Sequence, residues 1–204
     1  MNFAVLRWAK TTPESGVTVN REIGRLELRM EQSGEHTKVN VLQTTRYSQP
    51  NNRLEAELIC NRDPLLSLRS WKLRSSIEER DDCLYEVSGR REGDSVQIED
   101  ALAPRVFAVS GPLVCQWTLV LSTAVSSRLG GRFGLLEDLL LYKPNQQLVR
   151  EPDVVIGYRD GDHKMTCYSQ RGPGVLPLHY YADEQARTQL VTQGALAWAL
   201  AEAG

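Results

Sequence analysis

Apolar and polar residues alternate over most of the first hundred positions of the chain. In residues 53–60, RLEAELIC, apolar side chains occupy every second position, and Arg53, Glu55 and Glu57 stand between them. This period of two is typical of a β-strand with one buried and one solvated face. Turn-forming segments such as residues 48–52, SQPNN, separate these strands, so the pattern predicts an antiparallel meander.

The alternation changes phase inside two of the expected strands. Apolar residues fall at odd positions up to Ile23 and at even positions from Leu26 onward, and the change falls at Gly24. A second change separates Leu68 from Trp71. An extra residue at such a point forms a β-bulge, which bends the strand. We therefore expect a strongly curved sheet, a half-barrel or roll.

Residues 110–131 follow a helical period instead. Ser110 suits a helix N-cap, Pro112 is favoured in the first turn, and Gly130 is a typical stop. Apolar residues recur between them every three or four positions, at Leu113, Trp117, Val120, Leu121 and Ala124. The segment predicts one main helix at about 112–128, packed with this stripe on the concave face of the sheet.

The chain then returns to strands. Residues 133–144, FGLLEDLLLYKP, fit a short helix and a strand equally well. Residues 154–169 contain a turn sequence, RDGD, between two apolar-faced runs, and residues 175–181 alternate again. The expected fold class is mainly β: a curved antiparallel meander with one main helix.

Residues 179–191, HYYADEQARTQLV, hold the densest group of reactive side chains. Alternating apolar residues precede and follow the polar linker, which favours a hairpin over a catalytic cluster. We expect Asp183 and Glu184 to lie in an exposed loop and to tolerate alanine within about 0.5 kcal/mol. Gly194 is expected to form a bulge or a close backbone contact within the second strand.

Composition narrows the classes of function. The chain has 204 residues with 24 Lys and Arg against 26 Asp and Glu, a formal net charge of −2. Without a basic excess or a polybasic run, we expect no binding of nucleic acid or of an anionic membrane surface. We expect one domain over residues 1–204, in which residues 1–15 form a loosely attached N-terminal segment.

The N-terminal segment does not resemble a signal peptide. Charge and proline follow an apolar stretch of about five residues, whereas a signal peptide needs roughly 7–15. No run approaches the roughly 20 apolar residues of a transmembrane helix. These features favour a cytoplasmic location, with a mature cell-envelope protein that has lost its leader as the alternative.

The four cysteines, Cys60, Cys83, Cys115 and Cys167, are spaced too widely for the close ligand pairs of zinc sites. Their neighbours are apolar, so we expect reduced structural cysteines, with a disulfide as the alternative. We expect neither a metal nor a cofactor. No nucleophile elbow and no HExxH motif occurs in the sequence.

Two functions other than ligand binding stay open. One is an enzyme with a dispersed site around His179, Tyr180, Asp183 and Arg187, near the C-terminal hairpin. The other is a structural or interaction domain without a small ligand. Convergent polar groups with shifted pKa values would favour the enzyme. A filled core with an exposed apolar patch would favour the interaction domain.

The order of the elements resembles that of the half-barrel, LolA-like carriers of lipoproteins and lipids. The matching features are the opening strand VNREIGRLEL with its glycine bend, the helix at about 112–128, and the closing hairpin LPLHYYADEQARTQLV. The resemblance covers residues 16–200. It implies a bent sheet that wraps around a helix and leaves an apolar cavity, and it carries over no site residues.

We therefore expect a non-enzymatic protein that holds an apolar or amphipathic, lipid-like ligand between the curved sheet and the helix. Trp117 is expected to line this cavity, because its stripe faces the sheet, with completion of a solid core as the alternative. The candidate ligand-binding residues are the large apolar side chains of the helix and of the strands around it: Leu113, Trp117, Leu121, Trp71, Tyr180 and Trp198.

Overall fold

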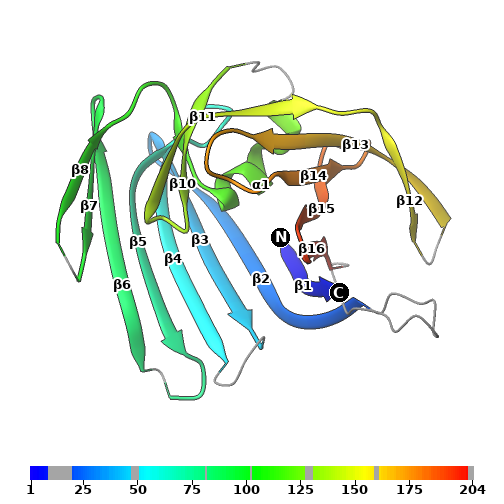
Figure 1. Ribbon diagram of the computed structural model, residues 1–204, viewed down its shortest axis with the longest axis horizontal. Coiled ribbons are helices and arrows are strands. Elements are labelled where there is room, and N and C mark those ends of the chain that lie inside the picture. The colour runs from blue at the N-terminus through cyan, green and yellow to red at the C-terminus, as the bar shows by residue number, and fades with distance from the viewer. Residues whose placement is uncertain are drawn as a thin grey trace.

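The computed structural model describes residues 1–8, 20–46, 51–80, 82–101, 103–126, 131–158 and 161–201. These residues form sixteen strands and one helix (Figure 1), so the expected mainly β fold is confirmed. The elements are β1 (Asn2–Trp8), β2 (Asn20–Ser33), β3 (His36–Thr45), β4 (Asn52–Asn61), β5 (Leu68–Ile77), β6 (Cys83–Glu92), β7 (Ser95–Asp100), β8 (Arg105–Ala108), β9 (Leu113–Val114), α1 (Gln116–Ser126), β10 (Phe133–Glu137), β11 (Leu141–Arg150), β12 (Val154–Tyr158), β13 (Gly161–Arg171), β14 (Leu178–Ala182), β15 (Thr188–Gln193) and β16 (Leu196–Leu200).

The strands form one curved sheet in the order β8-β7-β6-β5-β4-β3-β2-β1-β16-β15-β14-β13-β11-β10-β9, and β12 joins it by pairing with β13. Most neighbours in the sheet are consecutive in the chain and antiparallel, which confirms the expected meander; β9 and β10 are parallel. The end strands β8 and β9 do not pair with each other in the described part of the chain, so the sheet stays open. Figure 1 shows α1 between β2–β8 on one side and β13–β15 on the other.

Residues 2–8 differ from the loosely attached segment that the sequence suggested. They form β1, which pairs with β2 on one edge and with β16 on the other. The side chains of Phe3 and Val5 are buried in the core. The short apolar stretch at the N-terminus is therefore a sheet strand with both edges paired.

Both changes of phase in the sequence are bulges. Between β1 and β2 the register shifts at Ile23, so that Ile23 and Leu26 both point into the core. A Cβ on the adjacent Gly24 would lie 1.9 Å from the backbone oxygen of Thr44, so only glycine fits there. Between β4 and β5 the register shifts at Arg69. The β-bulges that the sequence predicted as the cause of the sheet's curvature are therefore present.

The main helix is shorter at its start than the sequence predicted. It begins at Gln116 instead of 112, because Gly111 is left-handed (φ 77°) and Leu113–Val114 extend as β9. The hydroxyl of Thr118 caps the first turn by accepting a hydrogen bond from the backbone N–H of Cys115 at 3.1 Å. The Ser110–Pro112 signal therefore marks a turn that precedes the helix.

The helix packs on the concave face of the sheet, as expected. Trp117 and Val120 are buried and Leu121 is half-buried, and α1 contacts β10, β14 and β15. The hydroxyl of Thr188 in β15 donates a hydrogen bond to the Val120 carbonyl oxygen at 2.7 Å. The side chain of Ala124 and the predicted stop at Gly130 lie outside the described residues.

The C-terminal region consists of hairpins. Residues 133–144, where periodicity left a choice, are strands β10 and β11 with a turn at 138–140. The dense segment at 179–191 is the β14–β15 hairpin, as expected. The prediction of a bulge or a close backbone contact at Gly194 is wrong: Gly194 is left-handed (φ 55°), forms the turn between β15 and β16, and has no atom of the described residues within 4 Å of an added Cβ.

The core fills most of the space between the sheet and α1. It collects the inward-facing side chains of strands from both halves of the sheet. The largest fully buried side chains are Trp71, Tyr180, Phe3, Leu28, Leu58, Leu68, Ile98, Leu113, Leu119, Leu135, Leu136 and Leu139.

Candidate functional site

A cavity of about 130 Å³ remains between α1, the end of β10 and the apolar face of the sheet. Its inner wall is buried and mostly apolar, formed by Leu26, Trp117, Val120, Leu135, Leu178 and Val191. Its mouth is formed by residues that solvent reaches: Gln43, Leu54, Gln116, Glu137, Asp138, Gln193 and Trp198. The cavity is therefore amphipathic, with an apolar inner end and a polar mouth.

The structure brings two of the six expected site residues to this cavity. Trp117 lines its buried wall and Trp198 its mouth. Leu113, Trp71 and Tyr180 are fully buried in the surrounding core, and Leu121 is half-buried against the core without lining the cavity.

The polar mouth was not anticipated from the sequence. Gln116, the first residue of α1, and Asp138, in the β10–β11 turn, hold each other through two hydrogen bonds. The Gln116 Nε2 atom donates to Asp138 Oδ1 at 2.6 Å, and the Asp138 backbone N–H donates to Gln116 Oε1 at 3.2 Å. Because this pairing joins residues 22 positions apart, it could not be predicted from a local sequence motif.

The β10–β11 turn that carries Asp138 is inserted into the half-barrel. Asp138 and Leu139 are both left-handed (φ 50° and 57°), a conformation that costs a residue with a side chain roughly 1–2 kcal/mol. The Leu139 side chain is fully buried, and the Trp71 indole Nε1 donates a hydrogen bond to the Leu139 carbonyl oxygen at 3.1 Å. Burial and this hydrogen bond hold the strained turn in place.

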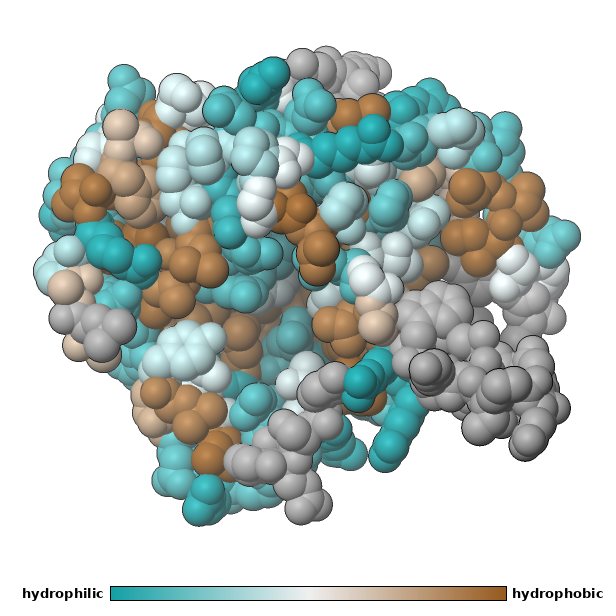
Figure 2. Space-filling model, in the orientation of Figure 1, coloured by the Kyte–Doolittle hydropathy of each residue, from teal (hydrophilic) through white to brown (hydrophobic). Residues whose placement is uncertain are grey.

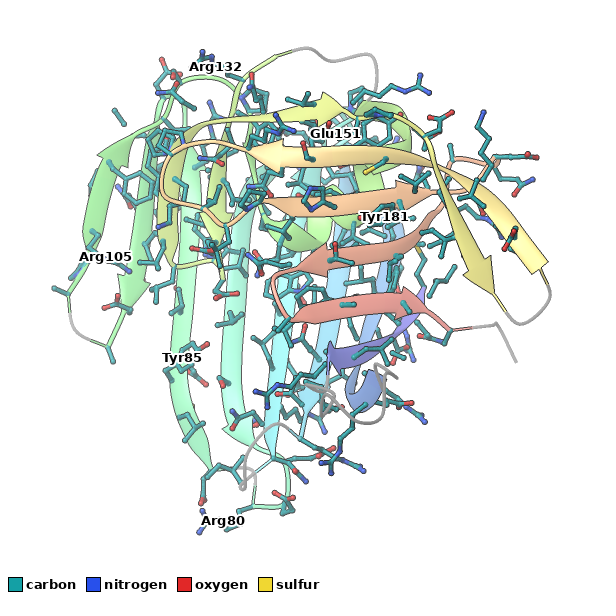
Figure 3. All side chains as sticks on the ribbon, turned by 45° about the vertical axis from the view of Figure 1, so that its right-hand side comes forward. Arg80, Tyr85, Arg105, Arg132, Glu151 and Tyr181 are labelled. Atoms are coloured by element: carbon teal, nitrogen blue, oxygen red, sulfur yellow. The ribbon has the colours of Figure 1, made fainter. Side chains whose placement is uncertain are left out.

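The electrostatic surroundings of the turn disfavour charge. Desolvation by the protein around it raises the pKa of the Asp138 carboxyl, although the hydrogen bond from Gln116 opposes the shift. Tyr85, which projects from β6 (Figure 3), also has a raised pKa, first through burial and then through the negative charge of Asp138.

One polar side chain reaches the inner wall. Gln170 in β13 is fully buried, accepts a hydrogen bond from the Tyr180 hydroxyl at 3.4 Å and donates one to Gln146 at 3.4 Å. Gln146 in turn donates to the carbonyl oxygens of Pro144 and Pro173, both at 3.0 Å. This buried network satisfies its own polar groups, so the inner end of the cavity behaves as an apolar surface.

A larger hollow of about 1020 Å³ lies over the solvated positions of β2–β7. Several of its charged side chains are already paired, as in Lys38–Glu57 at 2.7 Å and Arg74–Glu86 at 3.6 Å. Most of the acidic side chains that line it have a basic partner in the lining or beside it, as is usual on the solvated face of an antiparallel sheet. We therefore place the candidate site in the smaller, amphipathic cavity.

The residues of the suggested dispersed enzyme site do not converge. Tyr180 points into the core, whereas its neighbour His179 faces the other side of β14, across from Ser169. Asp183 and Arg187 pair with each other in the β14–β15 turn at 2.9 Å. The alternating directions of side chains along β14 separate the members of this group.

His179 belongs to a different polar cluster on that outer face. Ser169 and Arg171 both donate hydrogen bonds to the Glu151 carboxylate. The hydrogen bond from Ser169, followed by the charges of Arg171 and His179, lowers the pKa of Glu151. Arg171 also donates a hydrogen bond to the Ser169 hydroxyl oxygen at 2.8 Å, so Glu151, Ser169 and Arg171 form one connected polar network.

Within the described residues, neither the cysteines nor the potential metal ligands form a second site. All four cysteines are free, and burial raises the pKa of the Cys115 thiol to about 11. No group of three or more potential metal ligands occurs among the described residues. Figure 2 shows hydrophobic residues on one face of the molecule in separate groups between hydrophilic ones. Within the described segments, no helix has the length and apolar character needed to cross a membrane.

Comparisons with known proteins inform the fold alone. No protein-family model and no curated protein matches the chain. Among solved structures, the chain is similar to a β-barrel-like protein of domain of unknown function DUF1849 from Brucella abortus, with a TM-score of 0.55 and 10% sequence identity. The alignment covers 97% of this chain and 93% of that chain. At this identity the likeness shows a shared β-barrel-like fold.

Proposed function

We propose that the protein binds a small amphipathic molecule whose apolar part occupies the cavity between α1 and the sheet. The observation that carries this proposal is the division of the cavity into an apolar inner wall with Trp117 and a polar mouth with Asp138. A ligand with one apolar and one polar end would match both parts. The resemblance of the element order to LolA-like carriers supports a binding role of the same general kind.

The size of the cavity limits the apolar part of the ligand. An engineered apolar cavity of about 150 Å³ in another protein binds benzene. The cavity here, about 130 Å³, therefore suits a six-membered ring or a short branched chain. Typical ligand pockets measure roughly 300–1,000 Å³, so a complete lipid chain would have to extend through the mouth.

Burial of the apolar part gives a modest affinity by itself. Full burial of a phenylalanine-sized side chain contributes roughly 1.5–3 kcal/mol. The loss of translational freedom on binding opposes this gain. We infer that the polar groups at the mouth supply the remaining affinity and orient the ligand.

Titration with 2-phenylethanol tests the proposal, because its ring matches the cavity and its hydroxyl reaches the mouth. Binding is measured by ligand-observed NMR and by fluorescence of the tryptophans. The variant Val191→Phe places a larger side chain at the buried cavity wall, and Val106→Phe makes the same change at an exposed position of β8. We expect binding to the parent protein and to Val106→Phe, and loss of binding to Val191→Phe.

Thermal unfolding of the two variants completes the test. A phenylalanine that enters an existing cavity costs little stability, whereas overpacking of a filled core costs typically 1–3 kcal/mol. Absence of 2-phenylethanol binding to the parent protein, together with strong destabilisation of Val191→Phe, would contradict the proposed function.

A further inference from the structure

The charged side chains at the mouth of the cavity are all acidic. Its lining includes two carboxylates, Glu137 and Asp138, and no Lys, Arg or His. Lys143 approaches Glu137 at 3.8 Å, a distance that leaves only a weak ion pair. Among the described residues, no basic side chain forms an ion pair with Asp138. Of the two carboxylates at this mouth, Asp138 is therefore the one that has no basic partner within the described part of the chain.

The Asp138 carboxylate is also held in position before any ligand arrives. The Gln116 amide fixes Oδ1, and the buried Leu139 next to it anchors the turn through the Trp71 indole. A carboxylate fixed in this way loses little conformational entropy on binding a partner. The protein around it also removes part of its hydration, which strengthens its attraction to a positive charge.

Trp198 adds a second feature that favours a cation. Its half-buried ring lines the same mouth. The face of an indole ring attracts an ammonium group more strongly than other aromatic rings do. The neutral amide side chains of Gln43, Gln116 and Gln193 offer hydrogen-bond acceptors around it.

We propose that the natural ligand carries a protonated amine as its polar end and that Asp138 binds this amine at the mouth of the cavity. This inference rests on the proposed function, since the apolar part of the same molecule occupies the cavity. The ligand class is thus a small amine with one apolar substituent, of the kind formed by a phenyl ring on a short aminoalkyl chain. The alternative role of Asp138 is structural, as a residue that tolerates the left-handed turn.

A series of three probes separates charge recognition from apolar binding. 2-Phenylethylamine, 2-phenylethanol and 3-phenylpropanoate share the ring and carry a positive, a neutral and a negative end. Affinities are measured by isothermal titration calorimetry on the full chain at neutral pH. We expect the amine to bind about tenfold more tightly than the alcohol, as charge-assisted hydrogen bonds allow, and the acid to bind most weakly.

The variant Asp138→Asn identifies the group that binds the amine. Asparagine tolerates the left-handed conformation and keeps an oxygen that accepts the hydrogen bond from Gln116, so the turn is preserved while the charge is removed. Asp94→Asn, in the exposed β6–β7 turn, is the matched control for a lost negative charge. We expect the tenfold preference for the amine to disappear in Asp138→Asn and to persist in Asp94→Asn.

The outcomes distinguish this inference from the proposed function. If the alcohol and the amine bind the parent protein equally, the inference is overturned and the proposed function stands. If Asp138→Asn keeps the full preference for the amine, Asp138 is not the recognising group and the inference is likewise overturned. If none of the three probes binds the parent protein, the proposed function itself fails.

Discussion

The Trp71 indole nitrogen donates a hydrogen bond to the Leu139 carbonyl oxygen at 3.1 Å, between residues 68 positions apart in the sequence. Both side chains are buried. This contact ties β5, in the N-terminal half of the sheet, to the tip of the β10–β11 hairpin, which carries Asp138. The position of the candidate site thus depends on how Trp71 is packed.

Replacement of Gly89 by alanine should displace Trp71. Gly89 pairs with Trp71 across β5 and β6, and an added Cβ would lie 2.2 Å from Trp71 Cζ2 and 2.8 Å from the Gln97 carbonyl oxygen. We expect a loss of roughly 1–3 kcal/mol in the free energy of unfolding, measured by urea denaturation. The control is Gly157→Ala, where the nearest atom to the Cβ is Asp162 Oδ1 at 3.4 Å. Equal stability of the two variants would show that Trp71 has room to move.

The two buried tryptophans should differ in what their removal costs. Trp71→Ala removes a fully buried side chain and leaves an unpaired Leu139 carbonyl, so we expect a loss of roughly 3–5 kcal/mol. Trp117 already borders the cavity, so Trp117→Ala removes fewer contacts and should cost less. Denaturation curves of the two variants provide the comparison. A cost for Trp117→Ala that matches or exceeds that for Trp71→Ala would place Trp117 in a filled core.

Asp183 and Glu184 should respond differently to alanine, contrary to the expectation from sequence. Asp183 Oδ1 accepts a hydrogen bond from the Arg187 backbone N–H at 2.8 Å, and Oδ2 accepts bonds from the side chains of Arg187 and Gln189. The side chain of Asp183 is only 14% exposed, whereas Glu184 is exposed. We expect Asp183→Ala to lower the free energy of unfolding by about 1 kcal/mol, as loss of a turn-capping carboxylate does. Glu184→Ala should stay within about 0.5 kcal/mol, so equal urea midpoints for the two variants would show that Asp183 does not stabilise the turn.

Asp138→Asn should stabilise the ligand-free protein at neutral pH. Although solvent reaches the Asp138 side chain, the surrounding protein removes part of its hydration and raises its pKa in the folded state, so the folded chain binds this proton more tightly than the unfolded chain does. Stability therefore decreases as the pH rises from the ordinary aspartate pKa through the raised value. The variant lacks this decrease, so the difference from the parent protein should vanish at low pH and be largest at neutral pH. Urea denaturation between pH 3 and 8 measures it.

Glu151→Gln provides the opposite case. The pKa of Glu151 is lowered, so its ionised form stabilises the folded state above the ordinary glutamate pKa, and that contribution disappears as the pH falls through the lowered value. We expect this variant to be less stable than the parent protein at neutral pH. A pH profile with the same sign for Asp138→Asn and Glu151→Gln would contradict the assigned environments.

Most of the fold was predictable from the period of apolar and polar residues along the chain. Strands β2 to β7 follow the alternation of the sequence, and the bulge beside Gly24 coincides with the change of phase there. These features are local, because a strand with one solvated face carries its own pattern. The helix start was less predictable, since the left-handed Gly111 and the pairing of Leu113–Val114 with β10 depend on distant residues.

Most of the candidate site could not be predicted from the sequence. The apolar wall with Trp117 could be expected from the helix stripe, but the mouth brings together Gln116, Asp138 and Trp198 from separate elements. Asp138 and Leu139 are left-handed without glycine in the turn, so no turn signature marks them. Left-handed residues that carry side chains break the local rule by which turns are recognised from sequence.

The place of β1 in the sheet has a consequence for synthesis. Its partner β2 follows shortly in the chain, but its other partner is β16, so that Phe3 pairs with Leu200. On the ribosome, the hairpins from β2 to β8 can form as they emerge. The second edge of β1 stays unpaired until β16 has been synthesised. An unpaired strand edge is a template for association with other chains. The β15–β16 hairpin thus covers the second edge of β1, and a ribosome that stalls before residue 196 leaves that edge unpaired.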